Sequence, residues 1–196
     1  CRAGQRAQYR SEDYRVKVSL SRSFSPQKAP GTITPGAPLL GTQGARVVLG
    51  SDGGSLVQAI TPAPHLMFGP RGVCLHPDGS LWVSDTGHHR VLGGKTVPPR
   101  DDPPADILLG QPDFGREGRN AKGLVAANTV NVPTGITAFR GGLAVADPWN
   151  HRVLIWRETP AGPEHGADIV LGQPDAGSAL ANVGLSHARA DTMHWP

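Results

Sequence analysis

One short phrase occurs twice in this chain, and it limits the folds that the chain can adopt. It reads SDTGHHRVL at 84–92 and ADPWNHRVL at 146–154, so that matched residues are 62 positions apart. The matched pairs are Asp85 and Asp147, His89 and His151, Arg90 and Arg152, Val91 and Val153, and Leu92 and Leu154. A phrase that returns at a fixed period is typical of a repeat protein, in which each copy builds one structural unit.

Two further patterns repeat in register with the first. ARVVLG at 45–50, ADILLG at 105–110 and ADIVLG at 167–172 are copies of a short branched-apolar run that ends in glycine. Such runs are typical of strands of about four or five residues. Pro70 and Pro133 each precede the pattern x-Gly-apolar-x-apolar, whose alternation predicts a further strand.

In chain order, one unit holds four apolar segments separated by turns rich in Gly, Pro and Asp. LWVSD (81–85) or LAVAD (143–147) follows the proline segment, and RVLGG or RVLIW and then ADI-x-LG come next. Four short antiparallel strands in a unit of about 62 residues predict a β-propeller blade with one enlarged loop. We therefore predict an all-β fold, a β-propeller of four-stranded antiparallel blades. Its two full units lie at about 70–132 and 133–195, preceded by a lone strand at 45–50.

Other repeat architectures fit the sequence less well. The rungs of a β-helix are much shorter than this unit, and a β-sandwich does not repeat a sequence motif at a fixed period. Helical repeats are disfavoured because no segment carries apolar residues at helical spacing over several turns.

Two blades do not close a propeller ring, which typically needs at least about four. We expect the chain to be an incomplete, N-terminal portion of a propeller that further blades of the same protein complete. The run at 45–50 would then supply the fourth strand of the last blade; alternatively, residues 14–44 form a degenerate blade. Alone, this portion is expected to be marginally stable or to self-associate, because each uncovered Leu, Ile or Val forgoes roughly 1.5–3 kcal/mol.

Residues 1–44 are interpreted as a basic N-terminal arm and linker with one candidate strand at 14–20. YRVKVSL alternates apolar and polar residues, as a half-buried strand does. Residues 1–30 carry seven Lys and Arg against Glu12 and Asp13. A solvated tail is favoured over nucleic-acid binding, because the arm has few aromatic residues on which bases stack.

The two cysteines, Cys1 and Cys74, form neither a disulfide framework nor a metal-binding spacing. Cys74 lies in the apolar run GVCL and is expected to be a small buried hydrophobe. No apolar run approaches the ~18 residues that span a membrane. The compartment stays open: a secreted, periplasmic or cell-surface location is slightly favoured over a cytoplasmic one, because Cys1 fits a processed lipoprotein. A partial chain explains that terminus equally well.

The pattern P-x-G-apolar-x-apolar, D-G-x-L-x-V-x-D and N-H-R-V resembles the NHL repeat. The second copy, PTGITAFRGGLAVADPWNHRVLIW, keeps the triplet Asn150-His151-Arg152. The first copy, PRGVCLHPDGSLWVSDTGHHRVLGG, has His88 where Asn is usual. ADIVLGQPD is similar to a phrase in many bacterial NHL-repeat proteins. The resemblance covers about 45–196 and implies a β-propeller. It leaves several functions open: ligand-sensing extracellular domains, protein- or RNA-binding platforms and, in one branch, a metal-dependent amidating lyase.

The repeated polar residues are interpreted as structural, because a catalytic site needs its residues once and these occur in both units. We expect each Asp to accept N–H groups of the turn that follows it. We expect each Arg to pair with that Asp or with neighbouring carbonyls. The predicted structural residues are Asp85, His89, Arg90, Asp147, Asn150, His151 and Arg152.

Candidate binding residues are found where the two copies differ. His88 and Trp149 lie in the turn between the second and third strands, and loops at strand ends commonly carry function. We predict both as contacts on the loop face. No catalytic or metal-ligating residue is predicted, and the sequence implies no cofactor.

These observations favour a non-catalytic propeller scaffold that binds a protein or a small ligand through its loop face. The alternative is a metal-dependent lyase or hydrolase whose site lies at the propeller channel, mostly in blades outside this chain. No spacing in the sequence selects a set of the remaining histidines as a metal site shared between blades. These histidines are His65, His76, His165, His187 and His194. Neither a nucleophile elbow nor a phosphate-binding loop is present in the sequence.

Overall fold

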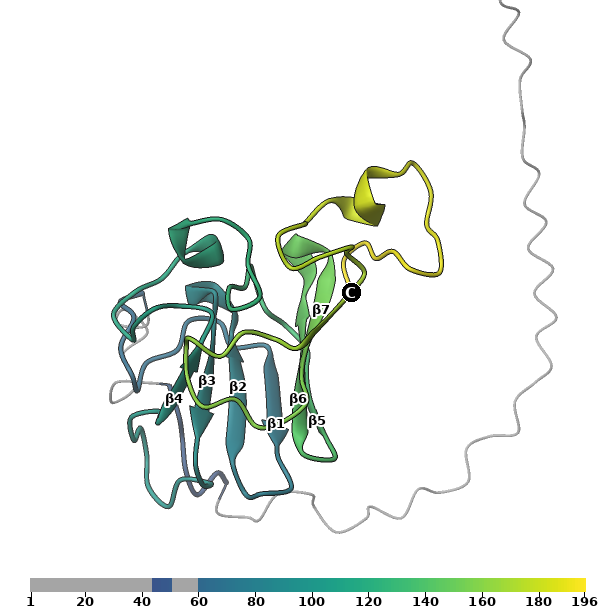
Figure 1. Ribbon diagram of the computed structural model, residues 1–196. Coiled ribbons are helices and arrows are strands. Elements are labelled where there is room, and N and C mark those ends of the chain that lie inside the picture. The colour runs from purple at the N-terminus through teal and green to yellow at the C-terminus, as the bar shows by residue number, and fades with distance from the viewer. Residues whose placement is uncertain (1–43, 51–59) are drawn as a thin grey trace, which may run out of the picture. The chain divides into compact units, whose positions relative to one another are not determined.

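The computed structural model describes residues 44–50 and 60–196 of the chain. The candidate strand at 14–20 and nearly all of the basic arm lie outside the described residues. The described part forms two four-stranded antiparallel sheets, each with its strands in chain order, that stand side by side (Figure 1). The predicted all-β fold with two four-stranded units is therefore confirmed.

The first sheet, blade 1, is built from β1 (Gly72–Leu75), β2 (Leu81–Asp85), β3 (Arg90–Gly94) and β4 (Ile107–Leu109). Blade 2 is built from β5 (Ile136–Phe139), β6 (Gly142–Asp147), β7 (Arg152–Trp156) and β8 (Ile169–Leu171). Within the described ranges, the helical segments are the short 3₁₀ turns η1 (Thr86–His88), η2 (Arg119–Lys122), η3 (Pro148–Asn150) and η4 (Ala181–Gly184).

The turn between the second and third strands has the same geometry in both blades. One 3₁₀ turn is followed by a histidine in the left-handed conformation, His89 with φ 54° and His151 with φ 51°. Histidine is one of the non-glycine residues that enter this region more readily than most. The turn sets the register, so that Asp85 lies opposite Arg90 and Asp147 opposite Arg152.

The core lies between the two blades and follows from the alternation of side chains along each strand. Trp82 and Val91 of blade 1 face blade 2 and are fully buried. Leu143, Val145 and Leu154 of blade 2 face blade 1 and are equally buried. Trp156, Leu109 and Val130 complete the buried cluster, and Cys74 packs against it half-buried.

One glycine allows the blades to approach closely at their first strands. A side chain at Gly72 would clash with the backbone carbonyl oxygen of Thr134, the residue that leads into β5. At the matching position of blade 2, Gly135, the nearest atom to an added Cβ is the Cβ of Ala146 at 3.6 Å, an ordinary contact. The expected role of the glycine after proline, close approach of a neighbouring backbone, is realised at Gly72.

The run at 45–50, predicted as a lone strand, does not form one. Gly50 makes a single parallel bridge with Leu66, and the residues before it have no strand pairing. Its copies become β4 and β8 because they pair with β3 and β7. In the part of the chain that the structure describes, no strand equivalent to β3 or β7 is available to pair with the run at 45–50.

We expect Gly72→Ala to destabilise the chain by about 1–3 kcal/mol, the usual range for a clash in a packed interior. Gly135→Ala has room for its methyl group and should leave stability unchanged or raise it by roughly 0.4–1 kcal/mol. Urea unfolding at low protein concentration measures both. Equal losses in the two variants would show that blade contact is not what constrains Gly72.

Candidate functional site

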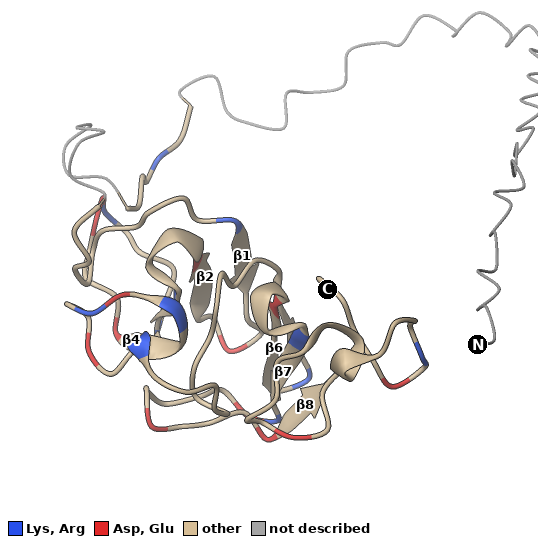
Figure 2. Cartoon of the chain, turned by 90° about the horizontal axis from the view of Figure 1, so that it is seen from above, with Lys and Arg blue, Asp and Glu red and all other residues tan. Residues whose placement is uncertain are grey.

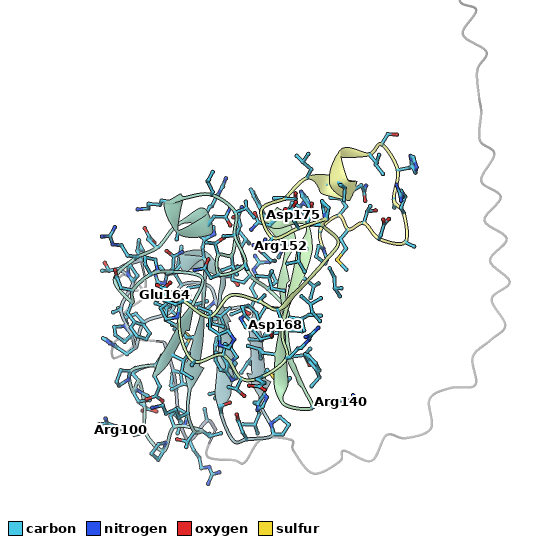
Figure 3. All side chains as sticks on the ribbon, viewed as in Figure 1. Arg100, Arg140, Arg152, Glu164, Asp168 and Asp175 are labelled. Atoms are coloured by element: carbon cyan, nitrogen blue, oxygen red, sulfur yellow. The ribbon has the colours of Figure 1, made fainter. Side chains whose placement is uncertain are left out.

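One end of the two blades carries the turns and long loops that surround the repeated motif. We define the loop face as η1, η3 and the loops 111–131 and 173–195, which lie at the same end of the sheets (Figure 1). Arg152 and Asp175 lie at this end, whereas Arg140, in the turn between β5 and β6, lies at the opposite end (Figure 3).

A buried ion pair stands at the beginning of the third strand of each blade. In blade 1, Arg90 donates from Nε to Oδ2 of Asp85 at 2.8 Å, and both side chains are fully buried. In blade 2, Arg152 and Asp147 repeat this contact at the same distance. The expectation that each arginine pairs with the aspartate of its own motif agrees with this geometry.

The rest of each guanidinium binds backbone carbonyls of two separate loops. Arg90 donates to the carbonyl oxygens of Ala63 and Leu66, which precede the blade, and of Phe114, which follows it, at 2.8–3.0 Å. Arg152 does the same with the carbonyls of Ala126, Thr129 and Ala176 at 2.7–2.9 Å. Each arginine therefore holds together the entry and exit loops of its blade.

The aspartates bind a different segment from the one expected. Oδ1 of Asp85 accepts the backbone N–H of Phe68, and Oδ1 of Asp147 accepts that of Asn131, both at 2.7 Å. These donors precede the blade, whereas the sequence predicts donors from the following turn. Within the turn, the N–H of His89 donates to the carbonyl of Thr86, and the N–H of Gly87 donates to the carbonyl of Phe68. Burial raises the pKa of the Asp147 carboxyl, against the opposing charge of Arg152.

The repeated histidine links its turn to the segment that enters the following repeat. Nδ1 of His89 accepts the backbone N–H of Val132 at 3.1 Å, and Nδ1 of His151 accepts that of Trp195 at 3.3 Å. An accepting Nδ1 must be unprotonated. Burial lowers the pKa of His89, and Arg119 lowers it further. Burial also lowers the pKa of His151, with His194 as the second cause.

Two glutamines that the sequence reading left without a role complete this scaffold. Gln111 donates from Nε2 to the carbonyls of His89 and Gly118 at 2.9 and 2.7 Å. Gln173 does the same with His151 and Leu180. The repeated LGQPD phrase was the available signal, and the contact explains it: glutamine fastens the turn to the loop that follows the fourth strand.

His88, predicted as a loop-face contact, is fully buried, and that prediction is corrected. Its Nδ1 lies 2.8 Å from Oδ2 of Asp85, and its Nε2 lies 3.2 Å from the carbonyl of Ile60. Asn150 occupies the same place in blade 2 and donates to Oδ2 of Asp147 at 2.8 Å. The difference between the two copies therefore reflects two ways of satisfying the buried carboxylate.

A buried amide pair accompanies Asn150. Its Nδ2 donates to Oδ1 of Asn120 at 2.8 Å, and Nδ2 of Asn120 returns a bond to Oδ1 of Asn150 at 3.3 Å. Asn120 has φ 50° inside η2, and Asn182 has φ 49° at the matching place of η4. The offset of these two asparagines, again 62 residues, was the sequence signal for this position.

Trp149 is 40% exposed, although Pro148 and Asn150 on either side of it are buried. The guanidinium carbon of Arg119 lies 4.7 Å from its ring centroid, within the range of a cation–π contact. The Trp195 ring lies 5.7 Å away with an interplanar angle of 35°. We name Trp149, Arg119 and Trp195 the Trp149 cluster. The sequence predicts only its first member, because the other two come from separate loops.

The described residues hold no group of three or more His, Cys, Asp or Glu side chains placed to bind a metal ion. His76 is buried in the turn between β1 and β2, where its Nδ1 accepts the N–H of Asp78 at 3.2 Å. Within the same residues, no helix has the length and apolar character that crossing a bilayer requires.

We expect Arg152→Met to cost about 3–5 kcal/mol of unfolding free energy, because it leaves Asp147 buried without its partner. Arg157→Met, at an exposed position of the same strand region, is the matched control and should be near neutral. Urea unfolding of both variants measures the difference. Similar effects in the two would contradict a role of the buried pair in holding the loops.

We expect the free energy of unfolding to fall as pH drops below about 6.5, the pKa of an unperturbed histidine. Unfolded His89 and His151 take up protons there, whereas their lowered folded pKa values keep the rings neutral. His89→Asn, which tolerates the left-handed conformation, should weaken this pH dependence. His187→Asn, at an exposed site, should retain it. Unfolding series across pH provide the measurement, and identical slopes in all three chains would argue against it.

Residues 69–93 match the family model of the NHL repeat. This range contains β1, β2, η1 and most of β3, and with them Asp85, His89 and Arg90. No curated protein matches the chain. Blade 2 repeats the strand order and the Asp–Arg contact of the matched range. Residues 69–93 therefore form an NHL repeat, and the two four-stranded sheets have the architecture of β-propeller blades.

Proposed function

We propose that this chain is a non-catalytic binding scaffold that engages a protein partner through the Trp149 cluster on its loop face. The observation that carries the proposal is the exposure of Trp149 in a turn whose other residues are buried. Tryptophan and arginine are the residues most enriched among the energetic hot spots of protein interfaces.

Hydrogen bonds to buried residues fix the turn that carries Trp149. Asp147 and Asn150 are hydrogen-bonded to each other and to buried neighbours, and His151 is tied to Gln173. A side chain already fixed in the free protein loses less conformational entropy on binding. This support favours a binding role for Trp149 over simple packing.

The polar groups of the repeated motif favour a scaffold over an enzyme. Arg90 and Arg152 use their donors on carboxylates and carbonyls, and Nδ1 of His89 and of His151 accepts a backbone N–H. Groups engaged in this way stabilise the loops and are not directed at a reacting molecule. The alternative metal-dependent lyase or hydrolase would need residues beyond those described.

The charge distribution over the described residues favours a protein partner over nucleic acid. Lys and Arg are interspersed with Asp and Glu when the loops are viewed from above (Figure 2). Affinity for nucleic acid depends on many Lys and Arg gathered against the phosphates. A protein partner requires only a central aromatic anchor with a mixed polar rim.

We expect Trp149→Ala to weaken binding by at least about tenfold, the size of an interface hot spot. Phe139→Ala is the matched control, because Phe139 is 39% exposed and lies at the opposite end of blade 2. A partner captured from source-cell extract is identified with the wild-type chain, and its purified form is then titrated against both variants by calorimetry. Arg119→Ala is expected to cause a smaller loss.

Two results would contradict the scaffold function. One is a partner whose affinity is the same for the wild-type chain and for Trp149→Ala. The other is stoichiometric zinc or calcium in the purified protein, measured by mass spectrometry, which would favour the lyase or hydrolase alternative.

A further inference from the structure

His88 is a fully buried histidine whose two ring nitrogens both face hydrogen-bond acceptors. Its Nδ1 lies 2.8 Å from Oδ2 of Asp85, and its Nε2 lies 3.2 Å from the backbone carbonyl oxygen of Ile60. A carbonyl oxygen and an ionised carboxylate can only accept hydrogen bonds. A neutral imidazole carries one N–H and satisfies one of these partners, whereas an imidazolium satisfies both.

Both oxygens of the Asp85 carboxylate already act as acceptors. Nε of Arg90 donates to Oδ2 at 2.8 Å, and the backbone N–H of Phe68 donates to Oδ1 at 2.7 Å. A positive charge at this distance favours the ionised form of a carboxyl group. The hydrogen between Asp85 and His88 therefore belongs to Nδ1 of the imidazole.

Arg90 does not supply a hydrogen to the same nitrogen. Its Nη2 lies 3.5 Å from Nδ1 of His88. The two hydrogens of Nη2 bind the carbonyl oxygens of Ala63 and Leu66, at 3.0 and 2.8 Å. Because a guanidinium Nη carries two hydrogens, none is left for the imidazole, and Nδ1 of His88 is not an acceptor.

The residue at the same place in blade 2 also donates twice. Nδ2 of Asn150 donates to Oδ2 of Asp147 and to Oδ1 of Asn120, both at 2.8 Å. These bonds use the two hydrogens of the amide nitrogen. The place therefore requires two donors in both blades, and a histidine provides two only when each ring nitrogen carries a proton.

We propose that His88 is an imidazolium in the folded chain, and that loss of its proton releases the Ile60 carbonyl and loosens the segment that leads into blade 1. If the carboxylate keeps the hydrogen of Nδ1, a deprotonated Nε2 turns a lone pair toward that carbonyl. Asn150 does not titrate, so the equivalent contact of blade 2 is independent of pH. The proposal does not depend on the binding function of the loop face.

The charges next to His88 come from the ends of the strands that flank its turn. The Asp85 carboxylate, at 2.8 Å, is nearer than Nη2 of Arg90, at 3.5 Å. The adjacent His89 adds no charge in the folded chain, since its Nδ1 accepts a backbone N–H. The segment leading into blade 1 presents the Phe68 ring, whose centroid lies 5.8 Å from that of His88.

The direction of the pH effect follows from the number of protons in each state. The released form binds one proton fewer than the attached form, so that low pH favours attachment and rising pH favours release. Histidine ordinarily changes charge between about pH 5 and 8. This effect is opposite in sign to the one expected for His89 and His151, which are neutral in the folded chain.

The test is nuclear magnetic resonance of the full 196-residue chain with ¹⁵N-labelled histidine, which reads the protonation of each ring nitrogen. Both nitrogens of His88 are expected to carry a proton at about pH 6, inside the range in which histidine titrates. As the pH is raised, loss of one proton should coincide with a shift of the Thr61 amide signal. The N–H of Thr61 belongs to the same peptide group as the Ile60 carbonyl.

His88→Asn places in blade 1 the residue that occupies this position in blade 2. In this variant the Thr61 amide signal should lose its pH-dependent shift. His187→Asn, at an exposed site, is the matched control and should keep it. The ring nitrogens are read in the wild-type chain, so that the protonation of His88 is tested even if His88→Asn does not fold.

Three results would overturn the proposal. The first is a His88 ring with one unprotonated nitrogen at about pH 6 in the folded chain. The second is a His88 that keeps both protons until the chain unfolds, which would show that no separate release occurs. The third is a Thr61 signal that does not follow the titration of His88, or that shifts equally in His88→Asn.

Discussion

The buried carboxylate–guanidinium pair at the beginning of β3 and of β7 is the interaction on which the loop face of each blade depends. A charge removed from water is tolerated only when its remaining hydrogen-bonding groups are satisfied. Arg90 and Arg152 meet this requirement with carbonyls from the loops before and after their blade. The electrostatic demand of the pair therefore fixes the course of loops that have no regular secondary structure of their own.

The same demand explains how blade 1 admits His88 at the position where blade 2 has Asn150. Asp85 and Asp147 each need a further donor on Oδ2, which a histidine or an asparagine can supply. Positions that satisfy the buried pair are thus unavailable for binding, even where the two copies differ. Trp149 is different because its side chain is 40% exposed and contacts Arg119 and Trp195, which are not part of this network. A binding function is in this way separated physically from the interactions that hold the blade.

Much of the fold could be predicted from the sequence. The 62-residue period and the alternation of apolar residues predicted four strands per unit, and the strands lie where those runs lie. The run at 45–50 shows the limit of this reasoning, because a similar sequence becomes a strand only beside a partner strand. The aspartate contacts show a second limit: the donors, Phe68 and Asn131, lie 17 and 16 residues before the carboxylates. Local turn chemistry did not indicate that distance.

By itself, the sequence determined the repeat and the four strands of each unit, because both follow from patterns within one unit. Only the tertiary structure decided which of the differing residues is accessible. His88 is buried and Trp149 is exposed, and Arg119 and Trp195 join Trp149 from loops distant in the chain. Burial and long-range contact depend on how loops from different units meet. The sequence period of one repeat does not predict these contacts between loops.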